Sequence, residues 1–231
     1  MKALSVISIA MLIGLVGCAQ PVSRNATPRI LAIGDSLMAW HGSSGKAIPN
    51  AVSRELGEPV VNRSVGGARI LYGLPVTGAL GMKIENQYTE GNWDWIVVNG
   101  GGNDLWLGCG CIACDGKLDR MIASDGRRGE IPRLVSELRD TGARVIYVGY
   151  LRSPGLNSII EHCRDEGDEL ERRIDKLAAL LPGVYFLSLA DLVPDGDRSY
   201  HAADMIHPSI KASTAIGRSV AEIIRTAPAD G

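Results

Sequence analysis

The chain has 231 residues, of which 45% are hydrophobic and 22% charged, and its formal net charge is −2. This length supports one sizeable core and falls short of a clear two-domain protein. A near-neutral charge without a basic stripe gives no electrostatic basis for nucleic acid as a partner, so we expect none.

The first predicted element is an N-terminal export signal. Lys2 precedes a continuous apolar stretch over residues 3–16, which is too short to span a bilayer, where about 20 residues are needed. We therefore expect residues 1–17 to be a signal peptide. Residues 15–18, LVGC, resemble a bacterial lipobox, in which Cys18 is lipidated and becomes the mature N-terminus. An uncleaved anchor and a plain signal peptide are the alternatives.

A short tether, rich in Pro, Ser, Asn and Thr, follows the lipidated cysteine over residues 18–28. A diacyl or triacyl anchor meets the two-chain requirement for stable membrane attachment. Residues 29–231 are then one folded domain outside the cytoplasm, on the periplasmic side of the bacterial envelope. The resemblance to lipoproteins, with Ala19 after the lipid cysteine, implies sorting to the outer membrane.

Short apolar runs alternate with helical patterns along the folded part. Branched residues dominate the runs and polar residues do not interrupt them, which is typical of strands covered on both faces. Strand–helix alternation predicts right-handed crossovers and a parallel sheet with helices on both faces. The expected strands are Ile30–Ile33, Pro59–Asn62, Trp95–Asn99, Val145–Gly149 and Val184–Leu187, and the expected helices are Ser43–Leu56, Ala79–Tyr88, Gly129–Thr141, Asn157–Leu181 and Ser209–Thr226.

Polar segments follow the predicted strands, where ligands bind in such sheets. The segments are GDS at 34–36, NRSVGGAR at 62–69, NGGGNDLW at 99–106 and, near the C-terminus, DMIHPS at 204–209. Each piece alone fits an ordinary turn or helix cap. Together they supply complementary parts of one acyl-transfer site.

Acyl transfer needs a nucleophile, a base, a group that orients the base, and donors for the oxyanion. Ser36 is the expected nucleophile, and its own N–H is one oxyanion donor. The Gly67 N–H is a second donor, since a residue without Cβ lets a carbonyl come close. The Asn103 amide is a third, because it donates without bringing charge. His207 is the expected base, and Asp204 orients its ring.

In order and spacing, these segments resemble the blocks of the SGNH (GDSL) hydrolase family, from about Arg29 to Ser209. The resemblance implies a three-layer α/β/α, flavodoxin-like fold with a five-stranded parallel sheet. It also implies hydrolysis of esters, including acetyl groups on carbohydrates, lipids and thioesters. The proposed chemistry needs no metal or other cofactor. In the second block, Gly66 is the alternative donor to Gly67.

A glycine- and cysteine-rich insertion from Leu105 to Asp125 leaves the third strand beside Asn103. We expect it to be a loop that borders the active site. Leu105 and Trp106, together with Leu107, are expected in the wall of the acyl pocket. The other predicted pocket residues are Asp35 and Leu37.

Four cysteines remain once Cys18 is set aside, and an even number in an exported chain favours disulfides. Three connectivities are open. A metal site that adds His162 to the cysteines is the alternative. The disulfide candidates are Cys109, Cys111, Cys114 and Cys163.

These features predict a serine ester hydrolase that works through an acyl-enzyme. The expected substrate is a small acyl ester, by default an acetyl ester, of a carbohydrate or lipid in the cell envelope. An envelope O-acyltransferase with the same site is one alternative. A non-catalytic lipoprotein that binds a glycan or a metal is the other.

Overall fold

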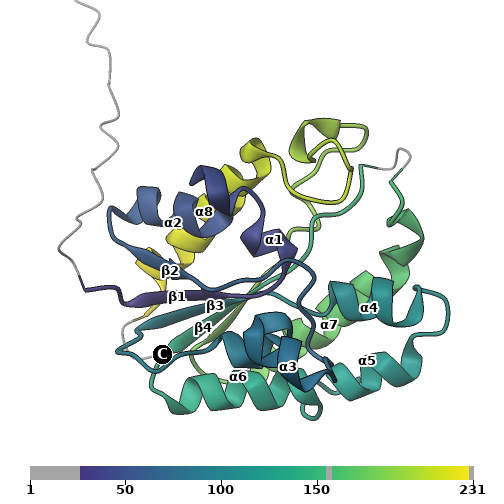
Figure 1. Ribbon diagram of the computed structural model, residues 1–231, viewed down its shortest axis with the longest axis horizontal. Coiled ribbons are helices and arrows are strands. Elements are labelled where there is room, and N and C mark those ends of the chain that lie inside the picture. Colours follow the sequence, from purple (N-terminus) through teal and green to yellow (C-terminus); the bar gives the residue numbers. More distant parts are fainter. Residues whose placement is uncertain (1–26, 155–157, 229–231) are drawn as a thin grey trace, which may run out of the picture.

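A five-stranded parallel sheet forms the centre of the protein (Figure 1). The computed structural model describes residues 27–154 and 158–228, so the predicted signal peptide and Cys18 lie outside the described residues. The strand order β2-β1-β3-β4-β5 is that of flavodoxin-like sheets, which confirms the expected fold class. The strands are β1 (Ile30–Ile33), β2 (Val60–Asn62), β3 (Trp95–Val98), β4 (Arg144–Val148) and β5 (Val184–Leu187).

Helices cover both faces of the sheet and give the protein its three layers (Figure 1). Alternate residues of β1 divide between two cores: Leu31 and Ile33 face one, and Ile30 and Ala32 the other. The second core packs against α1 (Ser36–Ala39), α2 (Ile48–Leu56) and α8 (Ile210–Thr226), and the first against α4 (Gly102–Cys109), α5 (Asp115–Met121), α6 (Glu130–Asp140) and α7 (Arg164–Leu180).

Three predicted helices are shorter or broken. The helix expected from Ser43 starts at Ile48, because Gly45 lies in the left-handed region with φ 66°. Gly81, with φ 96°, breaks the helix expected at 79–88. The long helix expected from Asn157 begins only at Arg164. The remaining short elements are η1 (Gly42–Ser44), α3 (Pro75–Thr77), η2 (Gly78–Met82), η3 (Ile84–Gln87), η4 (Glu161–Cys163) and η5 (Arg198–Tyr200).

The insertion at 105–125 is mostly helical, so the expectation of a loop was wrong. It contains the greater part of α4 and all of α5. Leu105, Leu118 and Met121 are buried in the core beneath the sheet, and their burial outweighs the low helix propensity of the glycines. Gly110, with φ 66°, ends α4 in the usual left-handed cap.

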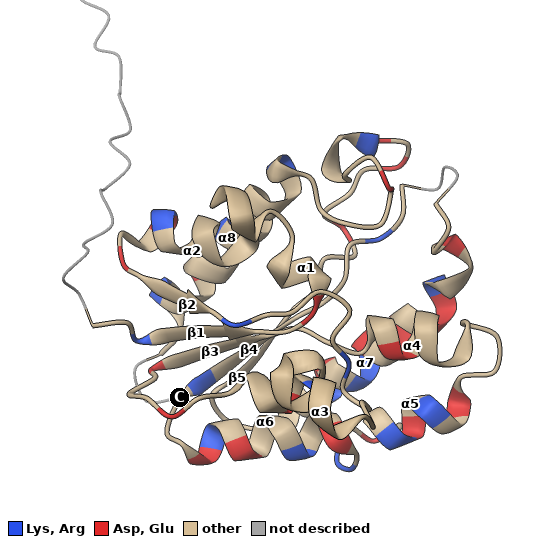
Figure 2. Cartoon of the chain, in the orientation of Figure 1, with Lys and Arg blue, Asp and Glu red and all other residues tan. Residues whose placement is uncertain are grey.

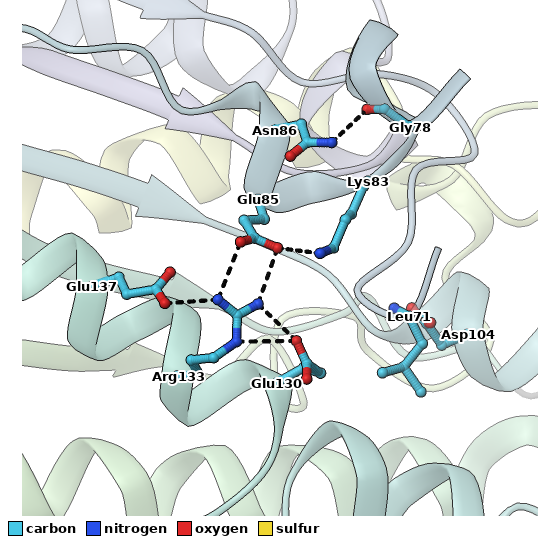
Figure 3. A network of polar contacts seen from close by, with 9 residues as sticks. All are labelled: Leu71, Gly78, Lys83, Glu85, Asn86, Asp104, Glu130, Arg133 and Glu137. Atoms are coloured by element: carbon cyan, nitrogen blue, oxygen red, sulfur yellow. Dashed lines mark hydrogen bonds and ion pairs between the residues drawn. The ribbon is translucent and has the colours of Figure 1, made fainter. Parts of the chain in front are cut away.

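An ion-pair network fastens the connection between β2 and β3 to α6 (Figure 3). Arg133 donates to both oxygens of Glu85, at 3.1 and 3.0 Å, and Lys83 pairs with the same carboxylate. The same two guanidinium nitrogens also donate to neighbouring carboxylates of α6, Nη1 to Glu137 and Nη2 to Glu130, each at 2.7 Å. The bonds from Arg133 and, second, from Lys83 outweigh partial burial and lower the pKa of Glu85 to about 2. The network thereby fixes the segment that leads from the second polar block to β3.

Charged residues of both signs are interspersed along α5 and α6 (Figure 2). Short-range pairs of opposite sign, such as Arg133 with Glu137, account for part of this pattern. Within residues 27–154 and 158–228, none of the helices combines the length and apolar character needed to cross a membrane.

Candidate active site

Ser36 opens α1 directly beyond the carboxyl end of β1. The turn before it requires glycine, because φ of Gly34 is 152° and a Cβ there would lie 2.8 Å from the carbonyl oxygen of Asn99. Asp35 caps the helix, and its Oδ1 accepts from the Leu37 N–H at 2.9 Å. The serine is therefore held at the edge of the sheet by a tight strand-to-helix turn.

Gln87 secures this turn from the other side. Its Oε1 accepts from the Gly34 N–H at 2.6 Å, and its Nε2 donates to the Gly34 carbonyl at 2.9 Å. The same amide nitrogen donates to the carbonyl of Gly81 at 2.8 Å. Because Gln87 is buried, all three bonds are shielded from water. The Gln87 side chain thus bonds both the N–H and the carbonyl of Gly34, as the backbone of a neighbouring strand would.

Asp35, one of the predicted pocket residues, borders the cavity described below, but both of its oxygens are engaged by the protein. Oδ1 caps α1, and Oδ2 accepts from the Tyr150 hydroxyl at 2.5 Å. Burial raises the pKa of Asp35 to about 6, although the donors on Tyr150 and Leu37 oppose the shift. The carboxyl group is therefore placed to hold the turn rather than to contact a substrate.

The predicted base and its orienting acid lie in contact in one tight turn. Asp204 Oδ1 accepts from the N–H groups of Ile206 and His207, both at 3.0 Å, and Oδ2 accepts from His207 Nδ1 at 2.6 Å. Met205 adopts a left-handed conformation, φ 58°, that closes the turn. Burial alone would raise the pKa of Asp204, but the donors on His207 and Ile206 outweigh it and lower the pKa. With the proton on Nδ1, Nε2 of His207 is free to accept one.

Ser36, Asn103 and His207 line one cavity of about 120 Å³ at the carboxyl edge of the sheet. The described residues include no hydrogen bond between Ser36 Oγ and His207 Nε2; such bonds are often long before a substrate is bound. Leu107 is 51% exposed on the outer side of α4 and does not border the cavity, so its predicted place in the wall was wrong. The apolar lining comes from Leu37, Leu105, Trp106, Leu151, Ile160, Leu170, Ile206 and Pro208.

The second and third polar segments meet beside this cavity. Asn103 Nδ2 donates to the Ala68 carbonyl at 3.1 Å, which leaves its second hydrogen available. Gly67 precedes Ala68, has φ 78°, and its N–H has no partner among the described residues. It does not itself line the cavity. Gly66 is exposed.

Asp104 fixes the backbone that follows the second segment. Its two carboxylate oxygens accept from the N–H groups of Ile70, at 2.9 Å, and Leu71, at 2.8 Å (Figure 3 shows Asp104 beside Leu71). Burial raises the pKa of Asp104, and the two donors only partly offset the shift. Asn103 and Asp104 together therefore join the start of α4 to residues 68–71.

Two disulfides shape the insertion, Cys109–Cys114 and Cys111–Cys163. The second joins the segment after α4 to the start of α7, and Cys163 borders the cavity. His162 lies within 4.8 Å of the sulfurs of Cys111 and Cys163. Both sulfurs belong to the disulfide, so this cluster does not offer the thiolates that the metal alternative required.

Sequence reasoning missed the segment after β4. Tyr150 and Arg152 border the cavity, and both are held by the buried Glu171 of α7. Glu171 Oε1 accepts from the Tyr150 N–H and from Arg152 Nη1, each at 2.7 Å. The position of these residues directly after the fourth strand was the available signal, the same one that marked the other segments.

The described fold, with a serine, a histidine–aspartate pair and an amide at the carboxyl edge of a flavodoxin-like sheet, defines an α/β protein of the serine hydrolase class. The sequence matches the family model of the GDSL-like lipase/acylhydrolase family over residues 32–214, and the chain belongs to this family. It is accordingly an SGNH-type hydrolase that acts on ester bonds. No curated protein matches the sequence.

Solved structures share the fold at low sequence identity. A protein from Slackia heliotrinireducens has a TM-score of 0.59 and 20% identity, over 86% of this chain and 100% of that one. A carbohydrate acetylesterase family member from Sinorhizobium meliloti has a TM-score of 0.57 and 17% sequence identity, over 86% of this chain and 98% of that one. The psychrotrophic esterase EstA from Pseudoalteromonas sp. has a TM-score of 0.57 and 16% sequence identity, over 85% of this chain and 96% of that one. At these identities the likeness establishes the fold alone.

Proposed function

We propose that this protein is a serine esterase that removes a small acyl group, by default acetyl, from an ester of a carbohydrate or lipid in the cell envelope. Ser36 attacks the ester carbonyl while His207 takes its proton at Nε2 and then delivers it to the leaving alcohol. Water, activated by the same imidazole, hydrolyses the acyl-enzyme. The observation that carries the proposal is the Asp204–His207 bond of 2.6 Å beside the cavity that Ser36 lines.

The proposed oxyanion donors are the N–H groups of Ser36 and Gly67 and the Asn103 amide. Asn103 supports this role because its bond to the Ala68 carbonyl fixes the amide while one hydrogen stays unused. An oriented neutral donor stabilises the charge that develops on the carbonyl oxygen more than it stabilises the bound ester. Loss of one such donor costs about 10²–10³ in rate.

The size and the lining of the cavity support the proposal that the acyl group is small. A cavity of about 120 Å³ is small beside the roughly 300–1,000 Å³ of sites for drug-sized ligands, which favours a short acyl group. Its mostly apolar lining suits a short alkyl chain. The fold shared with the Sinorhizobium meliloti carbohydrate acetylesterase family member supports acetyl as the default.

Hydrolysis of p-nitrophenyl esters of graded chain length, with fluorophosphonate labelling, tests the chemistry. We expect labelling and turnover in the wild type, neither in Ser36→Ala, and a rate about 10²–10³ lower in Asn103→Ala. Ser219→Ala is the matched control, since Ser219 lies in α8 and does not border the cavity. Full activity of Ser36→Ala would end the assignment. Product appearing on an added glycan instead of water would favour the acyltransferase.

We also propose that lipidated Cys18 tethers the enzyme to the envelope membrane, by resemblance of residues 15–18 to a lipobox. Metabolic labelling with a radioactive fatty acid tests this. The wild type should incorporate label and fractionate with membranes, and Cys18→Ser should do neither. Cys109→Ser is the control for loss of a cysteine elsewhere.

A further inference from the structure

We propose that Trp40 is a positioning residue that holds the imidazole of His207 in its catalytic orientation and favours the charge the ring acquires. This inference rests on the role of His207 as base in the proposed function. It goes beyond that function because the acid, base, nucleophile and oxyanion donors do not include Trp40.

The indole of Trp40 lies flat on the His207 ring. The ring centroids are 3.8 Å apart and the planes differ by 4°. Asp204 meanwhile holds one edge of the imidazole through Nδ1 at 2.6 Å. A ring held at one face and one edge has little freedom to rotate, and the nitrogen that stays available is Nε2. The stack therefore completes the constraint that Asp204 begins.

Trp40 is the C-cap of α1, the short helix that begins with the nucleophile. Ser36 is the first residue of α1, and the Trp40 N–H donates to the Ser36 carbonyl at 2.9 Å across a single helical turn. The nucleophile and the stacking ring are thus four residues apart, at the two ends of one helical turn that this hydrogen bond closes. The position of His207 relative to Ser36 is set by that turn, although the two residues come from opposite ends of the chain.

His41 adds a second, parallel contact. Its Nε2 donates to the Pro208 carbonyl at 3.1 Å. Trp40 thus contacts His207, and the next residue, His41, contacts the residue after His207. His41 has φ 65°, a left-handed conformation that non-glycine residues seldom adopt. Such a conformation persists where surrounding contacts over-determine it, and it clusters at functional sites. Here it turns the chain so that Trp40 and His41 both reach the loop of the base.

The stack should act mainly in the transition state. When His207 takes the Ser36 proton it becomes an imidazolium, and the negative face of an indole attracts a cation more than a neutral ring. An interaction that strengthens as charge develops raises kcat more than it lowers KM. Trp40 does not border the cavity, so substrate binding should be little affected by its replacement.

Trp40→Leu and Trp40→Phe separate the aromatic face from apolar bulk. We expect Trp40→Leu to lower kcat about tenfold with KM within about twofold, and Trp40→Phe to stay within about threefold of wild type, as the loss of one cation–π contact predicts. Trp93→Phe is the matched control, because Trp93 is a partly buried tryptophan outside the cavity lining. Equal kcat for Trp40→Leu and Trp40→Phe would overturn the inference.

Proton NMR of the histidine rings gives an independent readout. An imidazole stacked on an indole lies in its ring current, so one of the four histidines should show upfield-shifted ring protons. The signal should vanish in His207→Gln, persist in His41→Gln and move downfield in Trp40→Leu. Absence of the shifted signal in folded wild type would overturn the stack. A wild type that neither labels with fluorophosphonate nor hydrolyses esters would instead overturn the proposed function.

Discussion

Tyr150 and Asp35 lie 115 positions apart in the chain and share a hydrogen bond of 2.5 Å. The same hydroxyl accepts from the Gly102 N–H at 2.9 Å. Burial raises the pKa of Tyr150 well above its ordinary value, so the hydroxyl keeps its proton and remains a donor to the carboxylate. One side chain from the segment after β4 therefore joins the turn before Ser36 to the turn before Asn103.

Tyr150→Phe should lower kcat/KM about tenfold and destabilise the protein by about 1–3 kcal/mol. The change leaves one oxygen of Asp35 and the Gly102 N–H without their protein partner in a partly buried site. Both groups sit next to proposed catalytic residues, so their relaxation displaces the nucleophile relative to an oxyanion donor. Steady-state kinetics on p-nitrophenyl acetate and urea unfolding measure the two effects.

Tyr147→Phe is the matched control for this variant. Tyr147 lies three residues earlier, is fully buried, and donates to the Gly100 carbonyl at 2.9 Å. Its loss should cost similar stability and leave kcat/KM within about twofold. If both variants lose activity equally, the effect of Tyr150 is general loosening of the sheet edge and not a link between the two turns.

Asp35→Asn should stabilise the protein at pH 8 and not at pH 4. Burial raises the pKa of Asp35 from 3.8 to about 6 in the folded state, so the folded protein binds the proton more tightly than the unfolded chain. Stability is therefore lost as pH rises through this window, by an amount on the order of 2–3 kcal/mol above it. Asparagine carries no such penalty, and its amide can still accept from Leu37. Urea unfolding across pH 4–8 measures the difference; a constant difference would point to packing instead.

The strand-end rule located much of the candidate site from sequence alone. Ser36 and Asn103 follow apolar runs, and His207 precedes the last helix. The structure places all three around one cavity. The rule works because parallel strands deliver their carboxyl ends to a common edge. It did not find Gln87 or Trp40, whose contacts join segments that local patterns do not connect.

Packing also decided features that composition could not. The glycines around Cys109 suggested a loop, yet buried Leu105 and Leu118 hold helices there. The cysteine count left three connectivities, and only the placement of α7 beside α4 brings Cys163 within reach of Cys111. Side-chain burial between distant elements is the common cause, because a local window carries no information about it.

The Cys111–Cys163 disulfide should contribute more stability than Cys109–Cys114. Its cysteines are 52 residues apart in the sequence, whereas those of Cys109–Cys114 are 5 apart. The loop-closure model then predicts a stabilisation of about 4 kcal/mol for the longer bond and about 2 kcal/mol for the shorter one. Paired Cys→Ser replacements at each bond, followed by urea unfolding, test the ranking. Because Cys163 borders the cavity, removal of the longer bond should also weaken the preference for short esters. An unchanged chain-length profile would make this disulfide a staple without a role in specificity.

Gly167 should limit the length of the acyl chain. It lies in α7, borders the cavity, and a Cβ at this position would meet no atom within 4 Å. Gly167→Leu therefore places a side chain in open space near Leu170, and its Cβ does not clash with the protein. We expect kcat/KM for p-nitrophenyl hexanoate to fall about tenfold or more, and that for the acetate to stay within about threefold.

Gly116→Leu separates this steric effect from helix stabilisation. Gly116 lies in α5, a Cβ there would also meet no atom within 4 Å, and the residue does not border the cavity. Both replacements remove a glycine from a helix and should raise stability by about 1 kcal/mol. Only Gly167→Leu should change the ratio of acetate to hexanoate rates. An equal fall for both esters in Gly167→Leu would mean that the acyl chain extends elsewhere in the cavity, toward Ile206 and Pro208 instead of α7.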